Sequence, residues 1–362
     1  MLSAKTKLKN AENLKQFLLE RNLIDTNFTS KVKQGEIFFP VKEEIKKNDY
    51  KIKLNDFKSQ LIEINLKEKE KKISLEDLLK EKLNSQEMKL IPKTQEIVGD
   101  IMIIEIPEEL EKKEKMIAEV YLKLNKQIKT IVKKTEIHSG TFRTRKVKVI
   151  AGKNKKETTH FENGIRLKLD IEKTYFSARL ANERLRIAKQ VKLNEKILVM
   201  FSGSLPYPLV LAKNSPAKEI IGIEINPDAH KFALNNVKLN KINGINQKKG
   251  KNNNQNTIIE LINGDVRTVL PNIDKKFDRI LMPLPKTSEE FLDIALPKIK
   301  NRGIIHLYSF LNEKDIDNEK IKIINLCDRL GFKIDIINTI KCGQHAPYTF
   351  RVCFDLKCQK NK

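Results

Sequence analysis

From Lys196 to the C-terminus, short apolar segments alternate with amphipathic ones, and this alternation restricts the fold more than any other feature of the chain. Such alternation favours an α/β fold in which helices cover both faces of a mostly parallel sheet. The last two segments are joined by CGQHAPY, which is too short for a crossover helix, so the last strand should run antiparallel to its neighbour. We predict a seven-stranded doubly wound sheet with strands at 197–201, 220–225, 257–262, 279–283, 304–310, 332–340 and 349–356.

The second of these strands ends in a single carboxylate, Glu224, and leads directly into a helix. Asn226, Pro227 and Asp228 are typical of a helix start, as N-cap, first helical residue and favourable first-turn charge. In α/β folds an acid at this position can accept hydrogen bonds from both hydroxyls of a ribose. Glu224 is therefore a candidate nucleoside ligand, and the alternative is an acid that only faces solvent.

Three other strand ends should meet Glu224 at the same edge of the sheet, within FSGSLPYP, NGDVR and MPLPK. The small residues Ser202, Gly203 and Ser204 would let a nucleoside with an amino-acid tail approach closely, and Asp265 could accept from an adenine amine. Only one glycine is present in the first segment and no G-x-G occurs. The pattern therefore favours adenine-nucleoside binding, with dinucleotide enzymes as the competing class.

Two smaller α+β domains should precede the sheet, so we divide the chain into residues 1–85, 86–170 and 171–362. In the first, Ala11–Leu23 has helical spacing, whereas Glu36–Val41 and Tyr50–Leu54 resemble strands. We expect this domain to be a binding module without catalytic residues.

In the second domain, a strand ending at Gly152 should form a hairpin with Gly164–Leu169. Farther along the chain, the polar segment Lys248–Asn256 should be a disordered surface loop.

Two groups of charged residues precede the large sheet. Arg143 and Arg145 follow Phe142 at a strand start, which suits contact with phosphates or base edges, although most such arginines face only water. Arg179, Glu183 and Arg186 share one face of a predicted helix. Glu183 could be a base oriented by its arginine neighbours, or the three could form an ordinary surface ion-pair row.

The chain carries 71 Lys and Arg against 47 Asp and Glu, a formal charge of +24. Such an excess attracts polyanions, so nucleic acid is the first partner to consider, with a lysine- and asparagine-rich composition as the alternative explanation. The four cysteines and five histidines match neither a zinc site nor a disulfide framework, so we expect reduced thiols and no metal. No apolar run approaches a membrane span. We expect a cytoplasmic monomer.

Several motifs resemble one family in order along the whole chain: FRTRKVKVIAG, YFSARLANER, GIEINPDAHKFALNNVKLNKI, NGDVR and RILMPLPKTSEEFLDIAL. They are similar to the archaeal and eukaryotic S-adenosylmethionine-dependent tRNA guanine-37 N1 methyltransferases. The resemblance implies a class I methyltransferase domain, a middle domain that grips the anticodon region and an N-terminal domain that docks on the outer corner of the tRNA. It implies methyl transfer to N1 of the guanine next to the anticodon.

The resemblance also implies roles for individual residues. Glu183 would be the general base and Arg143 the partner of guanine O6. Candidates for cofactor contact are Arg184, Phe201, Ser202, Gly203, Glu224, Ile225, Asp265, Val266 and Pro283. Candidates for contact with the RNA are Arg143, Arg145, Arg179, Pro285, Lys286 and Tyr348.

The chain departs from the family pattern at two places. Val199 stands where an aspartate is common, and the turn that follows, FSGSLPYP, has fewer glycines than usual. Pro283 replaces the asparagine that many members carry before Leu-Pro. These changes leave two alternatives open: a methyltransferase for a tricyclic wyosine precursor at the same nucleotide, and a catalytically silent tRNA-binding protein.

Overall fold

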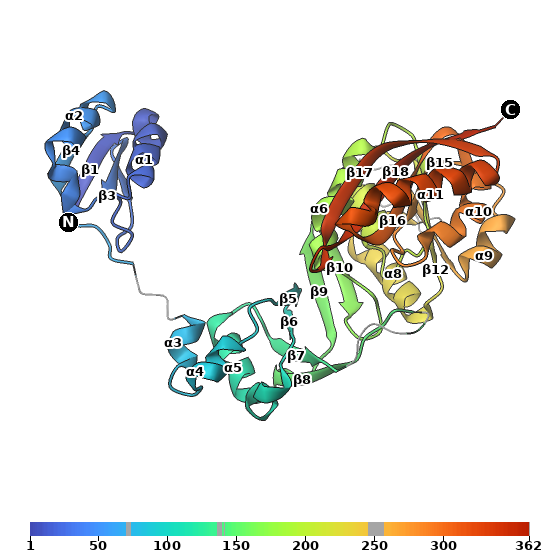
Figure 1. Ribbon diagram of the computed structural model, residues 1–362, viewed down its shortest axis with the longest axis horizontal. Helices are drawn as coiled ribbons and strands as arrows, with labels where there is room; N and C mark the ends of the chain where they lie inside the picture. Colours follow the sequence, from blue (N-terminus) through green and yellow to red (C-terminus); the bar gives the residue numbers. More distant parts are fainter. Residues whose placement is uncertain (70–73, 136–139, 141, 245–256, 362) are drawn as a thin grey trace. The chain divides into compact units, whose positions relative to one another are not determined.

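The structure is a computed structural model that describes residues 1–69, 74–135, 140, 142–244 and 257–361. It divides into two compact units, Met1–Leu78 and Leu79–Lys362 (Figure 1). The expected disordered loop, 248–256, lies outside the described residues. The three-domain division at 85 and 170 remains a prediction, because the two units do not test it.

The first unit is a four-stranded antiparallel sheet with helices packed against it. Leu14, Phe17 and Leu18 form the buried face of its first helix. The predicted strand Tyr50–Leu54 is wrong, because these residues lie in a helix. Tyr50 and Leu54 are four residues apart, a spacing that places both on one face of a helix, where they pack into the core. The elements are β1 Leu2–Lys7, α1 Ala11–Glu20, β2 Lys31–Lys33, β3 Glu36–Pro40, α2 Asn48–Asp56 and β4 Gln60–Glu63.

The second unit begins with short helices and a four-stranded sheet in the order β5-β6-β7-β8. The predicted hairpin between the strand ending at Gly152 and Gly164–Leu169 is wrong. That strand pairs with β7, and the polar segment after it contains a strand of its own, β9, which is the partner of β10. The helix α3 Leu75–Leu79 spans the boundary between the two units. The elements that follow are α4 Ser85–Lys89, β5 Glu96–Val98, β6 Ile101–Ile104, α5 Glu114–Leu124, β7 Thr130–Lys134, β8 Val147–Gly152, β9 Glu157–Glu162 and β10 Ile165–Asp170.

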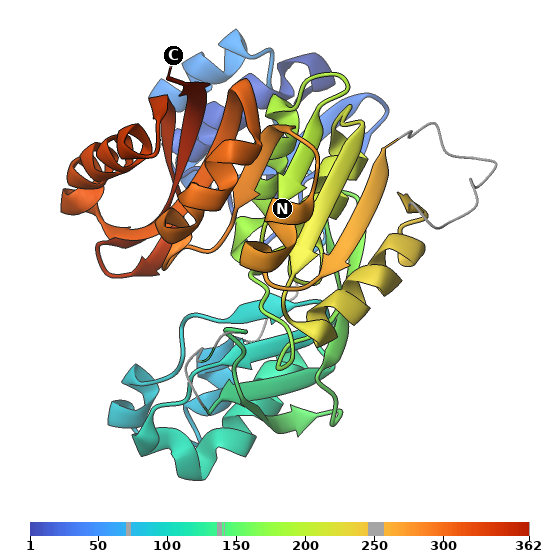
Figure 2. The ribbon, with the colours of Figure 1, turned by 90° about the vertical axis from the view of Figure 1, so that its right-hand side faces the viewer.

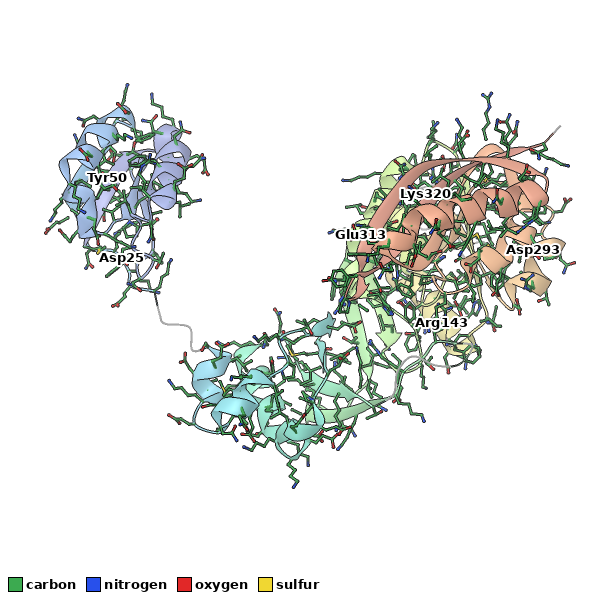
Figure 3. The ribbon with its side chains drawn as sticks, viewed as in Figure 1. Asp25, Tyr50, Arg143, Asp293, Glu313 and Lys320 are labelled. Carbon is green, nitrogen blue, oxygen red and sulfur yellow. The ribbon has the colours of Figure 1, made fainter. Side chains whose placement is uncertain are left out.

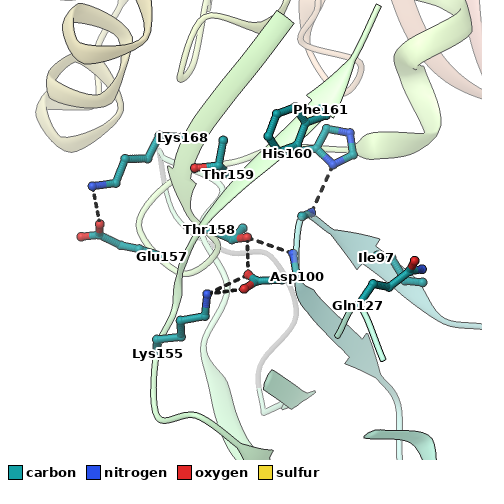
Figure 4. Close-up of a pocket in the computed structure, with 11 residues that line it drawn as sticks. Ile97, Asp100, Gln127, Lys155, Glu157, Thr158, Thr159, His160, Phe161 and Lys168 are labelled. Carbon is teal, nitrogen blue, oxygen red and sulfur yellow. Dashed lines mark hydrogen bonds and ion pairs between the residues drawn. The ribbon is translucent and has the colours of Figure 1, made fainter. Parts of the chain in front are cut away.

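The turn between β5 and β6 packs against β9 and joins the small sheet to the rest of the unit (Figure 4). The Gly99 amide donates to His160 Nδ1, and Thr158 Oγ1 donates to Asp100 at 2.7 Å. Gly99 has a positive φ, and a Cβ there would lie 2.2 Å from the Thr158 hydroxyl. Glycine is therefore required for this close approach.

The large sheet has the order β13-β14-β12-β11-β15-β16-β18-β17. Its strands are parallel except β18, which is antiparallel to both neighbours. The predicted seven strands and the antiparallel last strand are confirmed, and β13 adds a two-residue edge. The strands are β11 Lys196–Val199, β12 Glu219–Glu224, β13 Asn243–Gly244, β14 Ile258–Asn263, β15 Phe277–Met282, β16 Ile299–Asn312, β17 Phe332–Ala346 and β18 Thr349–Lys360.

Helices cover both faces of this sheet (Figure 2), and each face has its own hydrophobic core. Ile197 and Val199 of β11 pack into one core, with α6, α7 and α8, whereas Leu198 and Met200 pack into the other, with α9, α10 and α11. Alternate side chains of one strand thus enter opposite layers. The helices are α6 Ala181–Gln190, α7 Pro206–Asn214, α8 Pro227–Leu239, α9 Val266–Val269, α10 Leu292–Ala295 and α11 Ile316–Arg329.

In the described part of the chain, no helix has the length and apolar composition that a bilayer span requires. The four cysteines form no disulfide.

Candidate functional site

A cavity of about 100 Å³ lies where β11, β12 and β15 end. In doubly wound sheets ligands bind at this edge. Its volume is below the roughly 300–1,000 Å³ of most ligand pockets, so a nucleoside with a tail would also occupy the open mouth. Seven predicted cofactor residues line the cavity: Arg184, Phe201, Ser202, Gly203, Glu224, Ile225 and Pro283.

Glu224 lies at the end of β12 and is nearly buried. Its Oε2 accepts from the Gly203 amide at 2.6 Å, and its Oε1 accepts from the Asn226 amide at 2.8 Å. Burial raises the pKa of Glu224, and these backbone amides partly offset the rise. Each carboxylate oxygen keeps a second lone pair, so the ionised group can still accept from two vicinal hydroxyls. The residues therefore fit a ribose.

The turn after β11 has the left-handed backbone conformation that glycine usually adopts, although one of its residues is a leucine. Phe201, Gly203 and Leu205 all have positive φ, and Leu205, at +87°, is the N-cap of α7. This conformation is strained for a branched side chain, by about 1–3 kcal/mol. The Leu205 side chain is fully buried in the core beside α7, which holds the turn in place. The segment FSGSLPYP thus forms the turn next to Glu224 although it has fewer glycines than the family pattern.

Asp265 and Val266 are not among the described residues that line the cavity. Asp265 is the N-cap of α9, and its carboxylate accepts from the Arg267 amide at 2.8 Å. Contact of Asp265 and Val266 with an adenine therefore stays a prediction.

Arg184 supports the cavity wall. Its guanidinium is buried and donates twice to Glu162, at 2.5 Å each, and once to the Ser177 carbonyl. The same group lies over the rings of Phe176 and Tyr207. These contacts hold the guanidinium against the aromatic side of the cavity. Contact of Arg184 with the cofactor stays a prediction.

Arg143 enters the cavity from the segment before β8 and is labelled in Figure 3. Burial and the positive charge of Arg351 lower the pKa of Arg143, while Tyr175 acts in the opposite direction. Arg351, on β18, also lines the cavity and donates to the Tyr175 hydroxyl at 2.6 Å. Arg351 is 8% exposed, and its Nε has no hydrogen-bond partner among the described residues. Arg143 and Arg351 thus bring two guanidinium groups to the cavity in addition to that of Arg184.

Sequence reasoning missed Arg351, Tyr175 and Tyr207 as parts of this cavity. Arg351 lies 176 residues from Tyr175 in the chain, and no local pattern marks it. FSGSLPYP was selected for its small residues, and its tyrosine received no role.

Glu183, on α6, is only 4% exposed and is not among the described residues that line the cavity. Arg186 donates to both carboxylate oxygens, at 2.7 and 2.8 Å. The Tyr308 hydroxyl donates to Oε1 at 2.7 Å. Of the three residues predicted to share a helix face, Glu183 and Arg186 are paired on α6, with Glu183 buried and Arg186 partly buried. Arg179 lies in the 3₁₀ turn before α6 and is exposed.

The contacts of Glu183 continue into a buried chain of charged groups. Arg186 also donates to Asp355, at 2.7 and 3.1 Å, and Asp355 contacts His306 Nδ1 at 2.6 Å. The other ring nitrogen, Nε2, lies 2.6 Å from Arg279. Because an arginine can only donate, Nε2 must accept and Nδ1 must carry the proton, which makes His306 neutral. Burial likewise lowers the pKa of His306.

His306, Cys353 and Asp355 are close enough to hold a metal ion, with ligand atoms within 4.8 Å of one another. However, guanidinium groups already contact all three side chains, Arg186 the acid and the thiol, and Arg279 the imidazole. A cation at this point would lie against two positive charges, so we interpret the group as an ion-pair network.

The predicted RNA residues have different environments. Arg145 is buried, donates to Glu96 at 2.8 Å and lies outside the cavity lining. Pro285 is buried, and its carbonyl accepts from the Phe310 amide. Arg179, Lys286 and Tyr348 are exposed.

The exposed Arg179 and Lys286 belong to a positive surface beside the cavity. His345 stacks on Phe310, with ring centroids 4.1 Å apart. Its pKa is lowered by partial burial and then by the charges of Arg351, Lys286 and Arg179. These three cations therefore lie around one aromatic pair, an arrangement suited to a single-stranded nucleic acid.

A larger hollow of about 760 Å³ lies between the β5–β6 turn and the β9–β10 hairpin (Figure 4). None of the predicted site residues lines it, and its charges are paired locally, Lys155 with Asp100 and Lys168 with Glu157. The predicted cofactor residues thus lie at the smaller cavity and not at this hollow.

The doubly wound sheet with an antiparallel last strand, and the cavity beside Glu224, define a class I methyltransferase. Models of the TRM5/TYW2 methyltransferase domain and of the TYW2 N-terminal domain match residues 158–336 and 75–155. The chain belongs to the TRM5/TYW2 methyltransferase family. The predictions of the fold, the family and an S-adenosylmethionine-dependent methyltransferase are thereby confirmed.

Relatives match nearly the whole chain. It is 33% identical to tRNA (guanine(37)-N(1))-methyltransferase Trm5b of Pyrococcus abyssi over 98% of both sequences. A crystal structure of wild-type Trm5b from that organism aligns with a TM-score of 0.71 over 99% of each chain. The complex of aTrm5 and tRNALeu aligns at 30% identity with a TM-score of 0.66, again over 99% of each chain. The tRNA (guanine(37)-N(1))/4-demethylwyosine(37)-methyltransferase Taw22 of Nanoarchaeum equitans is 36% identical, over 65% of this chain and 90% of that one.

Proposed function

We propose that this protein transfers a methyl group from S-adenosylmethionine to N1 of the guanine at position 37 of tRNA. The observation that carries the proposal is the cavity in which Glu224, suited to the ribose of the cofactor, and Arg143, suited to the oxygen of a base, line the same space. Full-length similarity to Trm5b supports the same substrate.

The chemistry of guanine requires both a base and a cation. N1 carries a proton at neutral pH, so a general base must remove it before or during methyl transfer. The negative charge that then develops on O6 is stabilised by a nearby cation, a role that fits Arg143. S-adenosylmethionine supplies the methyl group as a sulfonium, and the electron pair of the broken S–C bond stays on sulfur. Glu183 is the proposed base.

The surface charges fit an RNA substrate. The net charge of +24 favours a polyanion, and the exposed Arg179, Lys286 and Tyr348 are the proposed contacts near the anticodon loop. We assign docking on the outer corner of the tRNA to the first unit, Met1–Leu78. A cytoplasmic, metal-free monomer remains part of this proposal.

Single-turnover methylation tests the function on two unmodified transcripts of one tRNA, with G37 or A37, followed by nuclease mapping of the labelled product. We expect label only in 1-methylguanosine at position 37. Label at another nucleotide, or on the A37 transcript, would contradict the proposed site.

A second substrate requires the same assay, because Pro283 lines the cavity at the position where the family resemblance implies an asparagine. Taw22, a relative of this chain, is named for both guanine and 4-demethylwyosine. Label on a tRNA that carries the tricyclic base, with none on G37, would assign the protein to that branch. A protein that binds tRNA but does not bind S-adenosylmethionine in a titration would be the catalytically silent alternative.

Cofactor affinity should fall as the pH is lowered from 7 to 5. Protonated Glu224 has one acceptor fewer for the ribose, and because its pKa is raised by burial, the loss begins at a higher pH than for an ordinary glutamate. The same raised pKa means that ionised Glu224 stabilises the unliganded fold less than the protonated form, which predominates at lower pH. Calorimetric titration with S-adenosylmethionine checks this, with Glu224→Gln as the control that should remove the pH dependence. An affinity that is constant in the wild-type protein would contradict the proposed role of Glu224.

A further inference from the structure

Two tyrosine hydroxyls connect the cavity to the proposed base. Tyr207, on α7, lines the cavity, and its hydroxyl donates to the Tyr308 hydroxyl at 2.9 Å. The Tyr308 hydroxyl, on β16, donates to Glu183 Oε1 at 2.7 Å. Both hydrogen bonds run in one direction, from the cavity wall to the carboxylate.

The two ends of this chain are suited to receive a proton. At the cavity end, no described residue donates to the Tyr207 oxygen, which leaves an acceptor position open. At the inner end, Glu183 is buried and is held by Arg186. For direct contact with a base in the cavity, Glu183 would have to leave two charge-assisted hydrogen bonds, which are among the stronger interactions in a protein.

We propose that Tyr207 and Tyr308 form a proton relay that carries the N1 proton of the substrate guanine to Glu183. The proposal rests on the proposed function. As the N1–H bond breaks, its proton joins the Tyr207 oxygen, the Tyr207 proton moves to Tyr308, and the Tyr308 proton moves to Glu183 Oε1. The electron pair of the N1–H bond stays on N1 and forms the bond to the methyl group, so each tyrosine ends the step neutral.

The surroundings favour neutral hydroxyls over tyrosinates. Tyr207 is 4% exposed and Tyr308 1%, and burial is the largest cause that raises their pKa values. The negative charge of Glu183 raises both pKa values further. A hydroxyl that neither gains nor loses net charge can pass a proton without creating a buried ion.

The experiment compares Tyr207→Phe and Tyr308→Phe with the wild-type protein in single-turnover methylation of the G37 transcript. Each substitution keeps the ring and removes one hydroxyl. We expect the rate to fall about 100-fold in both, the lower end for a lost proton-transfer step. Tyr121→Phe is the matched control, because the Tyr121 hydroxyl is also buried but donates to the Pro92 carbonyl beside the small sheet. Its rate should be unchanged.

Rates in mixtures of H₂O and D₂O give a second measurement that a purely structural role would not change. If several protons move in one step, a plot of the rate against the D₂O fraction is curved. If a single proton moves, the plot is a straight line. We expect the curve in the wild-type protein and a straight line in both tyrosine variants.

The outcomes separate the relay from its alternatives. Tyr207→Phe leaves the hydrogen bonds of Glu183 with Arg186 and Tyr308 intact, so a loss in Tyr308→Phe alone would make Tyr308 a positioning residue and overturn the relay. Unchanged rates in both variants would overturn it as well. A wild-type protein that methylates no G37 transcript would overturn the relay together with the proposed function, whereas the other outcomes leave that function standing.

Discussion

Glu183→Gln is expected to lower the single-turnover rate of methyl transfer by about 10²–10⁴-fold, the usual contribution of a general base. Glutamine keeps the size of the side chain and one oxygen that can accept from Arg186, but it cannot take up the proton of guanine N1. S-adenosylmethionine affinity should be unchanged, because Glu183 is not among the described residues that line the cofactor cavity.

Glu114→Gln is the matched control for this loss. Glu114 is also a buried acid paired with cations, Lys133 and Lys148, but it lies on α5 beside the small sheet. Its replacement removes a buried charge from the protein without touching the cavity. Equal losses of rate in the two variants would point to general destabilisation, and full activity of Glu183→Gln with cofactor binding intact would remove Glu183 as the base.

The large sheet could be predicted because short segments of the sequence are enough to mark its strands and helices. Ile220–Ile225 is apolar enough for burial on both faces, and Asn226 caps the following helix as its residue type predicts. The polar strand β9 could not be predicted in this way. It contains Thr158, Thr159 and His160, and what holds it is its pairing with β10 and its contacts with the Gly99 turn.

The candidate site was predictable to a similar extent. Ser202, Gly203 and Glu224 follow neighbouring parallel strands, so topology alone brings them together. By contrast, Glu183 meets Tyr308 across 125 residues of sequence, and Arg186 meets Asp355 across 169. Periodicity describes one helix face but not what that face packs against. The sequence therefore indicated that Glu183 and Arg186 pair on α6. It did not indicate that β16 and β18 pack over this pair.

Asp355 should stabilise the fold, because it is a buried acid that accepts from Arg186, which also donates to Glu183. Its carboxylate accepts from Arg186, His306, Gln190 and Asn338. Hydrogen bonds from His306 and Arg186 hold the pKa of Asp355 far below its ordinary value, against the effect of burial. The folded structure thus strongly favours the ionised form.

Asp355→Asn should therefore destabilise the second unit by about 3–5 kcal/mol, the usual result of removing one partner from a buried ion pair. The amide nitrogen of asparagine would face groups that are themselves donors, so part of the network would lose its acceptors. Pulse proteolysis in urea, with the 79–362 unit as the quantified fragment, measures the change.

The difference in unfolding free energy between the wild-type protein and Asp355→Asn should change with pH in one direction. Because the folded pKa of Asp355 is depressed, its stabilisation is present above the unfolded pKa of about 3.9 and is lost as the pH falls through the folded value. The gap between the wild-type protein and Asp355→Asn should thus be full at pH 7 and shrink below pH 4. Asp317→Asn is the control, since the Asp317 side chain is 88% exposed and its one ion pair among the described residues is with Lys320 on the outer helix α11. Lys320 is labelled in Figure 3. Such surface pairs contribute about 0–1 kcal/mol. A similar small change for Asp355→Asn would show that the network contributes little to stability and leave positioning of Arg186 against Glu183 as its role.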